Sequence, residues 1–292
     1  MIILTGAGGF IGSVTLGYLN KQGIDDVVLF DDLPTQSQYK NLVGKKFRSI
    51  HPHSVAEKTN FDPKDIQAVI HLGANSSTLE RDWMSIYKTN VASTRLWHSF
   101  CKASNIPFIF ASSAAIYGNG AGPINEYAFS KWVSEQEITD GVVLRLFNVY
   151  GPNEYHKGRM ASTIYHWYNQ IQETGKVSIF ENSRFYRRDF IWVEDVAKTI
   201  LHFVNNYKPG VYDLGTGKTR DFEILADTLC AEVKRGAKNF IAMPEDLKAQ
   251  YQTDTKADVT ALTAAGVDTT MFKDVGPGIQ EYVDYLKANK FY

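Results

Sequence analysis

Five short, nearly unbroken apolar runs punctuate the first half of the chain, at residues 2–5, 27–30, 68–71, 108–111 and 142–147. Runs of this length, apolar on both faces, are typical of parallel strands covered by helices on either side. Between them, segments of helical period occupy residues 11–20, 83–103 and 127–138. The alternation of strand and helix predicts right-handed crossovers and an α/β fold with a doubly wound parallel sheet.

The pattern changes after Tyr150. A loop rich in Gly, Pro, Asn and His at 151–158 precedes predicted helices at 161–172, 193–204, 221–233 and 275–288, and strand-like pieces at 177–180, 189–192 and 210–214. This is too broken for a second doubly wound sheet. We therefore expect two domains, residues 1–150 with the parallel sheet and residues 151–292 as a smaller α/β lobe, with elements around 189–220 returning to the first.

Composition narrows the class of protein. The 292 residues are 44% hydrophobic and 22% charged, and 31 Lys and Arg against 32 Asp and Glu give a net charge of -1. This profile is that of a globular protein and excludes collagen-like, disordered and disulfide-scaffold classes. Without a general basic field we expect neither a nucleic-acid nor a membrane partner.

The sequence contains no pattern typical of a membrane span, a secretory signal or a metal site. No apolar run approaches the roughly 18 residues of a membrane span, and the N-terminus lacks the pattern of a secretory signal, so we expect a cytoplasmic location. Cys101 and Cys230 belong to no ligand or redox spacing and are expected to be free thiols. His51 and His53 have no evident third ligand, so no metal is expected.

The string TGAGGFIG at residues 5–12 follows the first predicted strand and opens the first predicted helix. In that position Gly6 permits a tight turn, Gly9 lets the backbone approach a pyrophosphate, and Gly12 lets the helix pack close to the sheet. The free N–H groups of the helix start favour an anion. The string therefore predicts a dinucleotide site and a Rossmann-type domain.

Two carboxylates follow the second predicted strand. Asp31 or Asp32 can accept hydrogen bonds from the adenosine ribose, which favours NAD over NADP, or one of them can cap a turn before Pro34. A set of cations downstream could instead reach a 2′-phosphate: Lys40, Lys45, Lys46 and Arg48. Both cofactors stay open from the residues alone.

A tyrosine and a lysine share one face of a predicted helix, because Tyr127 and Lys131 are four residues apart. An unperturbed tyrosine is a poor base at neutral pH, and a neighbouring ammonium stabilises its phenolate. The strand at 108–111 runs into Ser112 and Ser113 at the carboxyl edge of the sheet, where such folds bind ligands. A serine there can hold a reacting oxygen while Tyr127 moves the proton.

The glycine string, Ser113, Tyr127 and Lys131 together resemble the extended short-chain dehydrogenase/reductase family of sugar-nucleotide epimerases and dehydratases. Residues 71–74, 90–94, 146–152 and 188–197 match further landmarks of that family, so the resemblance covers effectively the whole chain. It implies a tightly bound nicotinamide cofactor, NADP with NAD as the alternative. The residues it implies for cofactor binding, beyond the glycines and acids above, are Phe10, Ile11, Leu72, Gly73, Ala74, Asn75, Asn90, Lys131 and Val149.

Residues 154–162, 180–183, 213–217 and 247–252 resemble, more narrowly, the epimerases of ADP-linked heptoses. This likeness implies an ADP-heptose substrate of lipopolysaccharide core synthesis, a homo-oligomer (a pentamer), and two acid/base residues, Tyr127 and Lys157. It places in the substrate pocket Ser113, Asn148, Arg159, His166, Phe180, Glu181, Asn182, Ser183, Arg188 and Tyr251.

Inversion of a carbon with no neighbouring carbonyl requires temporary removal of hydride, and reduction from the other face suits a second proton donor such as Lys157. The two phosphates need a local cation cluster, for which Arg184, Arg187 and Arg188 are suited. The short segment 119–123, Leu72 in place of a glutamate, Gln38 in place of a basic residue and the large Arg159 depart from the heptose pattern. The alternatives are therefore an epimerase or dehydratase of a GDP- or UDP-linked sugar, and a non-catalytic relative that senses a cofactor or binds RNA.

Overall fold

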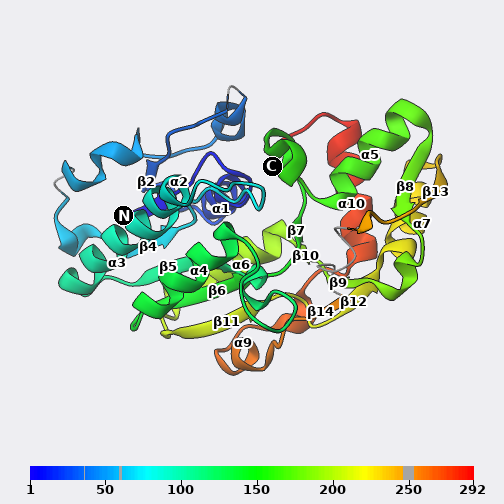
Figure 1. Cartoon of the computed structure of the whole chain (residues 1–292). Helices are drawn as coiled ribbons and strands as arrows, with labels where there is room; N and C mark the ends of the chain where they lie inside the picture. The colour runs from blue at the N-terminus through cyan, green and yellow to red at the C-terminus, as the bar shows by residue number, and fades with distance from the viewer. Residues whose placement is uncertain (36, 59–60, 246–252) are drawn as a thin grey trace. The chain divides into compact units, whose positions relative to one another are not determined.

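The computed structural model describes residues 1–35, 37–58, 61–245 and 253–292 (Figure 1). It divides into two compact units. The first contains residues 1–146, 196–212 and Tyr292, and the second contains residues 147–195 and 213–291. Each unit has a core of its own, and each is described by itself below.

A seven-stranded sheet forms the centre of the first unit. Its strands lie in the order β11 (Gly210–Leu214), β6 (Val142–Leu146), β5 (Phe108–Ser113), β4 (Ala68–His71), β1 (Ile2–Thr5), β2 (Val27–Phe30) and β3 (Ser49–His51). Neighbours from β6 to β3 pair in parallel. The strand order reverses between β1 and β4, and ligands of doubly wound sheets bind outside the carboxyl ends at such a point. The predicted fold class is confirmed.

Helices cover the sheet. They are α1 (Phe10–Lys21), α2 (Trp83–Ile86), α3 (Ser93–Ser104), α4 (Glu126–Glu137) and α6 (Val193–Asn205). Figure 1 shows α3 and α4 alongside β4, β5 and β6, and α3 packs on β4 and β5 while α4 packs on β5. Shorter 3-10 turns are Gln38–Leu42 (η1), His53–Lys58 (η2), Pro63–Asp65 (η3) and Ala114–Tyr117 (η5). Phe30, Trp97, Phe108 and Phe110 belong to the apolar core of this unit.

The predicted continuous helix at 83–103 is wrong in its middle. A π-helical segment, Tyr87–Ala92 (η4), separates α2 from α3. The apolar face of the helix continues across its wider turn. The hydrophobic period of the sequence therefore does not distinguish this π-helical turn from an α-helical one. Segments of this kind are frequent at functional sites, and this one contains Asn90.

The described residues of the second unit form short strands and three longer helices. The helices are α5 (Thr163–Thr174), α7 (Phe222–Val233) and α10 (Val275–Lys287), with a shorter α9 (Thr260–Ala264). The strands are β7 (Val149–Tyr150), β8 (Lys176–Phe180), β9 (Arg187–Asp189), β10 (Ile191–Trp192), β12 (Thr219–Asp221), β13 (Ala237–Ile241) and β14 (Asp254–Thr255). The 3-10 turns are Tyr155–Met160 (η6), Ser183–Phe185 (η7) and Thr269–Met271 (η8).

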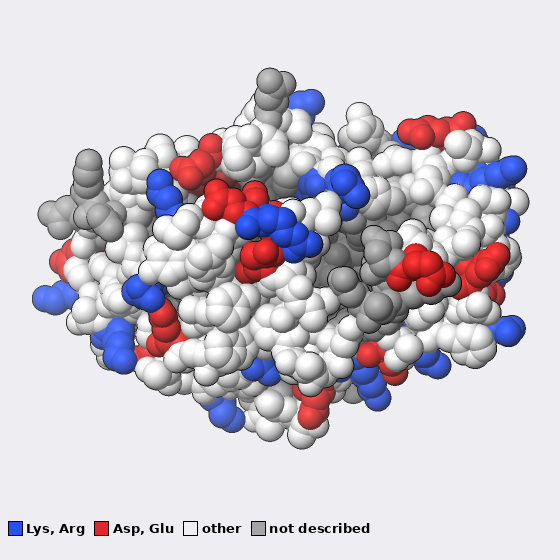
Figure 2. Space-filling model, viewed as in Figure 1, with Lys and Arg blue, Asp and Glu red and all other residues white. Residues whose placement is uncertain are grey.

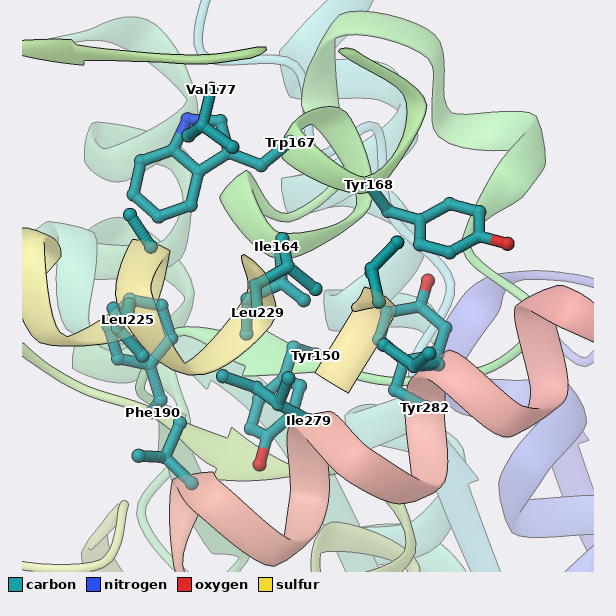
Figure 3. Close-up of a cluster of buried hydrophobic side chains, with 14 of the residues drawn as sticks. Tyr150, Ile164, Trp167, Tyr168, Val177, Phe190, Leu225, Leu229, Ile279 and Tyr282 are labelled. Carbon is teal, nitrogen blue, oxygen red and sulfur yellow. The ribbon is translucent and has the colours of Figure 1, made fainter. Parts of the chain in front are cut away.

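One apolar cluster holds α5, α7, α10 and β8 together. Figure 3 shows Ile164, Leu225 and Ile279 converging on it from three helices, with Tyr150 and Tyr282 among them. Tyr150 leaves no room beside Gly278, where a Cβ would lie 1.8 Å from the phenol oxygen. The close fit fixes α10 against β7.

Two strand predictions for this part of the chain need correction. The single strand expected at 189–192 is two strands, β9 and β10, which belong to different small sheets. Strand β13 was not predicted, because its residues are mostly exposed and carry no apolar run. It pairs in parallel with β8.

None of the helices in the described ranges is long and apolar enough to cross a membrane. On the face shown in Figure 2, Lys and Arg atoms are interspersed with Asp and Glu atoms, and the described residues there form no continuous basic surface.

Candidate functional site

The glycine string forms the turn between β1 and α1, at the point where the strand order reverses. Gly6 has φ +68°, in the left-handed region. A Cβ on Gly12 would lie 2.0 Å from the carbonyl oxygen of Gly6, so only glycine allows α1 to approach the loop this closely. The tight turn and the close helix packing expected of these two glycines are both present.

The start of α1 fits a dinucleotide pyrophosphate. Within the described chain, no side chain caps the helix at Gly9, so its N-terminal dipole remains available to an anion. Asp31 anchors the glycine turn, because its carboxylate accepts hydrogen bonds from the backbone N–H groups of Gly8 and Leu33, both at 2.8 Å. Asp31 is 8% exposed, and burial raises the pKa of its carboxyl group.

The cations expected near a 2′-phosphate lie mostly elsewhere. Lys46 pairs with Asp25 at 3.2 Å and Arg48 pairs with Asp26 at 2.7 Å. These two carboxylates precede β2, at the opposite end of the strand from Asp31. The ammonium of Lys45 donates to the carbonyl oxygen of Tyr292. Three of the four cations that could reach a 2′-phosphate are therefore paired elsewhere in this structure, and the fourth, Lys40, is exposed on η1.

A chain of hydrogen bonds runs beneath the glycine turn through His71, which is fully buried at the end of β4. The N–H of Gly73 donates to Thr5 Oγ1 at 3.0 Å, and Thr5 Oγ1 lies 2.8 Å from His71 Nδ1. His71 Nε2 lies 3.1 Å from Thr94 Oγ1, which donates to the carbonyl oxygen of Asn90 at 2.6 Å. The Thr94 hydroxyl donates its proton to Asn90, so toward His71 it can only accept. Nε2 of His71 is therefore the protonated nitrogen and Nδ1 the acceptor.

This chain ties together three segments expected to bind the cofactor. Burial lowers the pKa of His71 well below its ordinary value, with the positive charge of Lys131 acting in the same direction, so the imidazole is neutral. A neutral ring can donate at one nitrogen and accept at the other, as the chain requires. Both ring nitrogens of His71 are therefore hydrogen-bonded, as a buried structural histidine requires.

Asn90 connects the π-helical segment to the helix that carries Tyr127. Its amide exchanges hydrogen bonds with the backbone of Asn75, at 2.8 and 3.0 Å, and donates to Ser130 Oγ at 2.9 Å. Ser130 Oγ in turn donates to the carbonyl oxygen of Tyr127 at 2.7 Å. Asn75 and Asn90 therefore fix the edge of the site against α4.

Tyr127 and Ser113 are brought together as expected from the sequence. The phenol is half-buried near the start of α4 and is hydrogen-bonded to Ser113, the last residue of β5. Burial raises the pKa of Tyr127, and the bond to Ser113 acts in the opposite direction. In this state the phenol is a proton donor rather than a phenolate.

Lys131 lies one turn beyond Tyr127 and is 3% exposed. Its ammonium donates to the carbonyl oxygen of Ala111 at 2.7 Å and lies 4.7 Å from the centre of the Phe110 ring. Burial lowers the pKa of Lys131 to about 7, and the negative charge of Glu135 opposes that shift. The residue is thus poised to change its charge near neutral pH.

Glu135 continues the face of Tyr127 and Lys131 by one more turn, and sequence reasoning missed it. Its side chain is 3% exposed, accepts a hydrogen bond from Ser112 Oγ and pairs with Arg145 at 2.7 Å. Arg145 also donates to the phenol oxygen of Tyr117 at 2.8 Å. The i+4 spacing from Lys131 was a signal for Glu135, but no sequence signal identifies Arg145 as its partner.

The remaining candidates lie in the second unit, beginning with Lys157 on η6. Its backbone N–H donates to the carbonyl oxygen of Glu154 at 2.9 Å. The side chain is half-buried, and burial lowers the pKa of its ammonium while the charge of Glu154 raises it. Arg159, on the same turn, is exposed.

A second group of candidates follows β8. Phe180 ends the strand, Asn182 takes a left-handed conformation with φ 62°, and the hydroxyl of Ser183 is buried with no hydrogen-bond partner among the described residues. Such an unsatisfied group suits a polar ligand. Glu181 lies between Phe180 and Asn182, and its backbone N–H donates to the carbonyl oxygen of Ile241.

The arginines of this region differ in what they contact. Arg187 donates to the hydroxyl and the carbonyl oxygen of Thr219 through two nitrogens, at 3.0 and 3.2 Å. Its guanidinium is therefore used in contacts within the second unit. The guanidinium of Arg188 lies 5.7 Å from the ring centre of Phe222. Asn148 donates to the carbonyl oxygen of Asp189 at 2.8 Å.

The expected site residues therefore fall into two sets. The first unit contains those of the glycine turn, the segments after β2 and β4, Asn90, Ser113, Tyr127 and Lys131. The second unit contains Asn148, Val149, Lys157, Arg159, His166, Phe180, Glu181, Asn182, Ser183 and Arg188. Tyr251 lies outside the described residues, as does the string 247–252.

The chain resembles known proteins in both sequence and fold. The chain is 38% identical to an ADP-L-glycero-D-manno-heptose-6-epimerase from Brachyspira hyodysenteriae, over 100% of this chain and 99% of the relative. The structure resembles an ADP-L-glycero-D-manno-heptose-6-epimerase from Helicobacter pylori, with a TM-score of 0.84, 24% identity and coverage of 98% of this chain and 96% of that one. It resembles equally a UDP-N-acetylglucosamine 4-epimerase from Methanobrevibacter ruminantium, with a TM-score of 0.84, 22% identity and coverage of 99% and 98%.

Both structural likenesses therefore describe a fold shared by enzymes of different sugars. The sequence itself matches the NAD dependent epimerase/dehydratase family over residues 2–215. With the glycine turn, the uncapped start of α1 and the Ser113–Tyr127 pair in place, the chain belongs to the NAD dependent epimerase/dehydratase family.

Proposed function

We propose that the protein interconverts ADP-D-glycero-D-manno-heptose and ADP-L-glycero-D-manno-heptose by transient oxidation at C6″ of the sugar. The observation that carries this proposal is the 38% identity, over the whole chain, to a relative named as an epimerase of that type. The expected biological role is supply of nucleotide-linked heptose for lipopolysaccharide cores.

A nicotinamide dinucleotide bound at the glycine turn would supply a reversible acceptor for the hydride of C6″. The chain's own residues then have to move the hydroxyl proton. Tyr127 is proposed to exchange it for one epimer, with Ser113 holding the same oxygen. Lys131 is proposed to bind the nicotinamide ribose and to favour loss of the phenol proton.

The product epimer needs a proton to be delivered to, or taken from, the other face of the same carbon. We assign this step to Lys157, as the sequence resemblance implies. Burial lowers the pKa of Lys157, and this shift makes its ammonium a better proton donor than an exposed lysine. Arg188 and the unsatisfied hydroxyl of Ser183 are proposed to bind the polar tail of the substrate.

The test is conversion of each purified ADP-heptose epimer, followed by NMR at C6″. Tyr127→Phe and Lys157→Met should each reduce the rate by about 100-fold or more, and the double variant should abolish interconversion while retaining the dinucleotide. A double variant that epimerises at the wild-type rate contradicts the assignment of both residues. Tyr207→Phe is a matched control, because its phenol donates to the carbonyl oxygen of Asp140, before β6 starts.

A second candidate is an epimerase or dehydratase of a GDP- or UDP-linked sugar. The fold resembles a UDP-N-acetylglucosamine 4-epimerase as closely as it resembles the heptose epimerase, so the fold does not distinguish these two substrates. A dehydratase would release water and lower the product mass by about 18 Da, whereas an epimerase leaves the mass unchanged. A non-catalytic relative would turn over no nucleotide sugar at all.

The identity of the dinucleotide is a finer question. The sequence resemblance implies NADP, whereas the position of Asp31 and the ion pairs of Lys46 and Arg48 favour NAD. We propose that NAD binds more tightly. We also propose a cytoplasmic homo-oligomer, for which the resemblance implies a pentamer, and native mass spectrometry of the purified protein would report subunit number and retained dinucleotide together.

A further inference from the structure

The loop that carries Lys157 is closed at its base by a single buried carboxylate. Glu154 is 1% exposed and precedes η6. One carboxylate oxygen accepts hydrogen bonds from Ser162 Oγ at 2.6 Å and from Tyr282 Oη at 2.9 Å. The other accepts from the backbone N–H of Ser162. Residues 154 and 162 are thereby joined, and Lys157 lies on the loop between them.

Burial raises the pKa of Glu154, whereas the hydrogen bonds from Ser162 and Tyr282 and the charge of Lys157 act in the opposite direction and favour the ionised carboxylate. Ser162 Oγ accepts a hydrogen bond from the N–H of Tyr165 at 3.3 Å, so its own proton is directed to Glu154. Tyr282 keeps its proton, because burial and the charge of Glu154 raise its pKa well above the ordinary value. Three donors therefore converge on Glu154, an arrangement that suits the charged form and offsets part of the cost of burying it.

The loop itself is shaped to present Lys157. Gly158 has φ 52° and ψ -127°, a conformation that only glycine adopts readily, and it interrupts the turn directly after the lysine. At the far end, Ser162 caps α5, and α5 and α10 both contribute to the apolar cluster of Figure 3, in which Tyr282 is labelled. The base of the loop is thus anchored in the core of the second unit.

We propose that Glu154 is a positioning residue for Lys157, whose carboxylate closes the loop at Ser162 and supplies the negative charge that keeps the neighbouring ammonium protonated. The inference rests on the proposed role of Lys157 as the second acid/base residue. Glu154 itself is enclosed by Ser162 and Tyr282, and the proposal assigns it no contact with the sugar. Its effect is exerted through the position and the charge state of the lysine.

Other titratable groups lie on the same loop, Tyr155 among them, and on α5 and α10. His156 lies on the same loop, and the charge of Lys157 lowers its pKa together with burial. Tyr282 faces the carboxylate from α10, and Tyr165 on α5 acts on Tyr282. Arg159 is exposed on the loop. Glu154 is the carboxylate whose charge acts on Lys157, so it is the negative charge that the substitution removes.

The test is competitive acetylation of lysines in the apoprotein across a range of pH, with Lys157 followed by peptide mass spectrometry. This measurement reports the protonation of Lys157 without any turnover. Glu154→Gln should move its midpoint to lower pH by about half a unit or more. Tyr282→Phe removes one donor and leaves the charge, so its midpoint should stay at the wild-type value. An unmoved midpoint in Glu154→Gln overturns the electrostatic role.

Closure of the loop has its own readout. Ser162→Ala removes the hydroxyl donor but not Glu154, so hydrogen exchange across residues 155–161 should accelerate about tenfold while the acetylation midpoint stays fixed. Unchanged exchange overturns the closing role, and this variant decides the matter if Glu154→Gln does not fold. In turnover, Glu154→Gln should lower kcat about tenfold with KM unchanged.

Failure of the proposed function would be recognised separately. If Lys157→Met retains full activity, the lysine is not an acid/base residue, whereas a shifted acetylation midpoint would still assign its charge state to Glu154.

Discussion

The ammonium of Lys131 donates to the carbonyl oxygen of Ala111 at 2.7 Å, so the lysine is bound to the sheet. The phenol of Tyr127, one helical turn earlier, is bonded to Ser113. Because burial lowers the pKa of Lys131 to about 7 and raises that of Tyr127, the phenol is protonated and the lysine is only partly charged at neutral pH.

Binding of the dinucleotide is therefore expected to take up a proton. If the ribose is held by charged Lys131, the apoprotein at pH 8 must first protonate it, whereas at pH 6 it is already charged, since its pKa is about 7. Calorimetry of NAD binding in buffers of different ionisation enthalpy should show an uptake approaching one proton at pH 8 and close to none at pH 6. Lys131→Met should abolish the pH dependence of the uptake. Equal uptake at both pH values in the wild type would contradict this role of Lys131.

The contact between α1 and the glycine turn predicts a large effect of one methyl group. Gly12→Ala places a Cβ 2.0 Å from the carbonyl oxygen of Gly6, which forces α1 away from the turn. We expect loss of dinucleotide binding by at least about tenfold, because a shift of roughly 1 Å misaligns the N–H groups that face the pyrophosphate. Binding is measured by fluorescence titration.

Gly276→Ala is the matched control for that substitution. Gly276 lies in α10 with open space around its Cβ position and no left-handed φ. Alanine there should stabilise the fold by up to about 1 kcal/mol through helix propensity and leave dinucleotide binding unchanged. Equal binding losses in both variants would show that the close approach at Gly12 is not the cause.

How far the sequence predicts this site depends on whether chain spacing or the sheet brings residues together. Tyr127 and Lys131 were predicted on one helix face, and Ser113 was expected beside them because strand ends meet ligands at one edge of the sheet. Asp31 was predicted as an acceptor, but its partner in the glycine turn, the N–H of Gly8, follows from the pairing of β1 with β2.

The residues that sequence reasoning missed act through partners distant in the chain. Glu154 is anchored by Tyr282, which is 128 positions away. The π-helical segment that contains Asn90 keeps the apolar face of a regular helix, so its wider turn leaves no trace in the hydrophobic period. The pairing of Lys46 with Asp25 and of Arg48 with Asp26 could not be predicted, because sequence distance does not tell which end of β2 a residue meets.

The neutral state of His71 predicts a dependence of stability on pH. Its folded-state pKa is well below the ordinary value of 6.5, so the unfolded chain binds a proton that the folded chain does not. The stability from this group is complete above about pH 6.5 and falls by about 1.4 kcal/mol for each unit below it, until His71 itself is protonated. Urea unfolding at a series of pH values measures this slope.

His71→Gln provides the comparison, because glutamine offers a donor and an acceptor but does not titrate. The variant should be less stable above pH 7 and should lack the His71 contribution to the slope between pH 6.5 and 5. Parallel curves for the two proteins would mean that the buried imidazole does not control stability in this range.

The buried pair of Glu135 and Arg145 predicts a non-additive pair of substitutions. Arg145→Met removes the cation beside the 3%-exposed carboxylate of Glu135 and leaves it the hydrogen bond from Ser112. We expect a loss of about 3 kcal/mol in the free energy of unfolding, because the buried charge is no longer compensated. Replacing both residues, as Glu135→Leu with Arg145→Met, should recover part of that loss. If the double variant is as unstable as the sum of the single variants, the two residues do not act as a pair.

The choice of dinucleotide follows from which charges surround the end of β2. A 2′-phosphate placed beside Asp31 and Asp32 meets two carboxylates, and Lys46 is already paired with Asp25. We therefore expect the apoprotein to bind NAD at least about tenfold more tightly than NADP. Lys40→Ala should weaken NADP binding further, because Lys40 is the cation that remains near this end of the strand, while Lys46→Ala should not change it. Tighter binding of NADP, lost in Lys40→Ala, would show that this lysine outweighs both carboxylates.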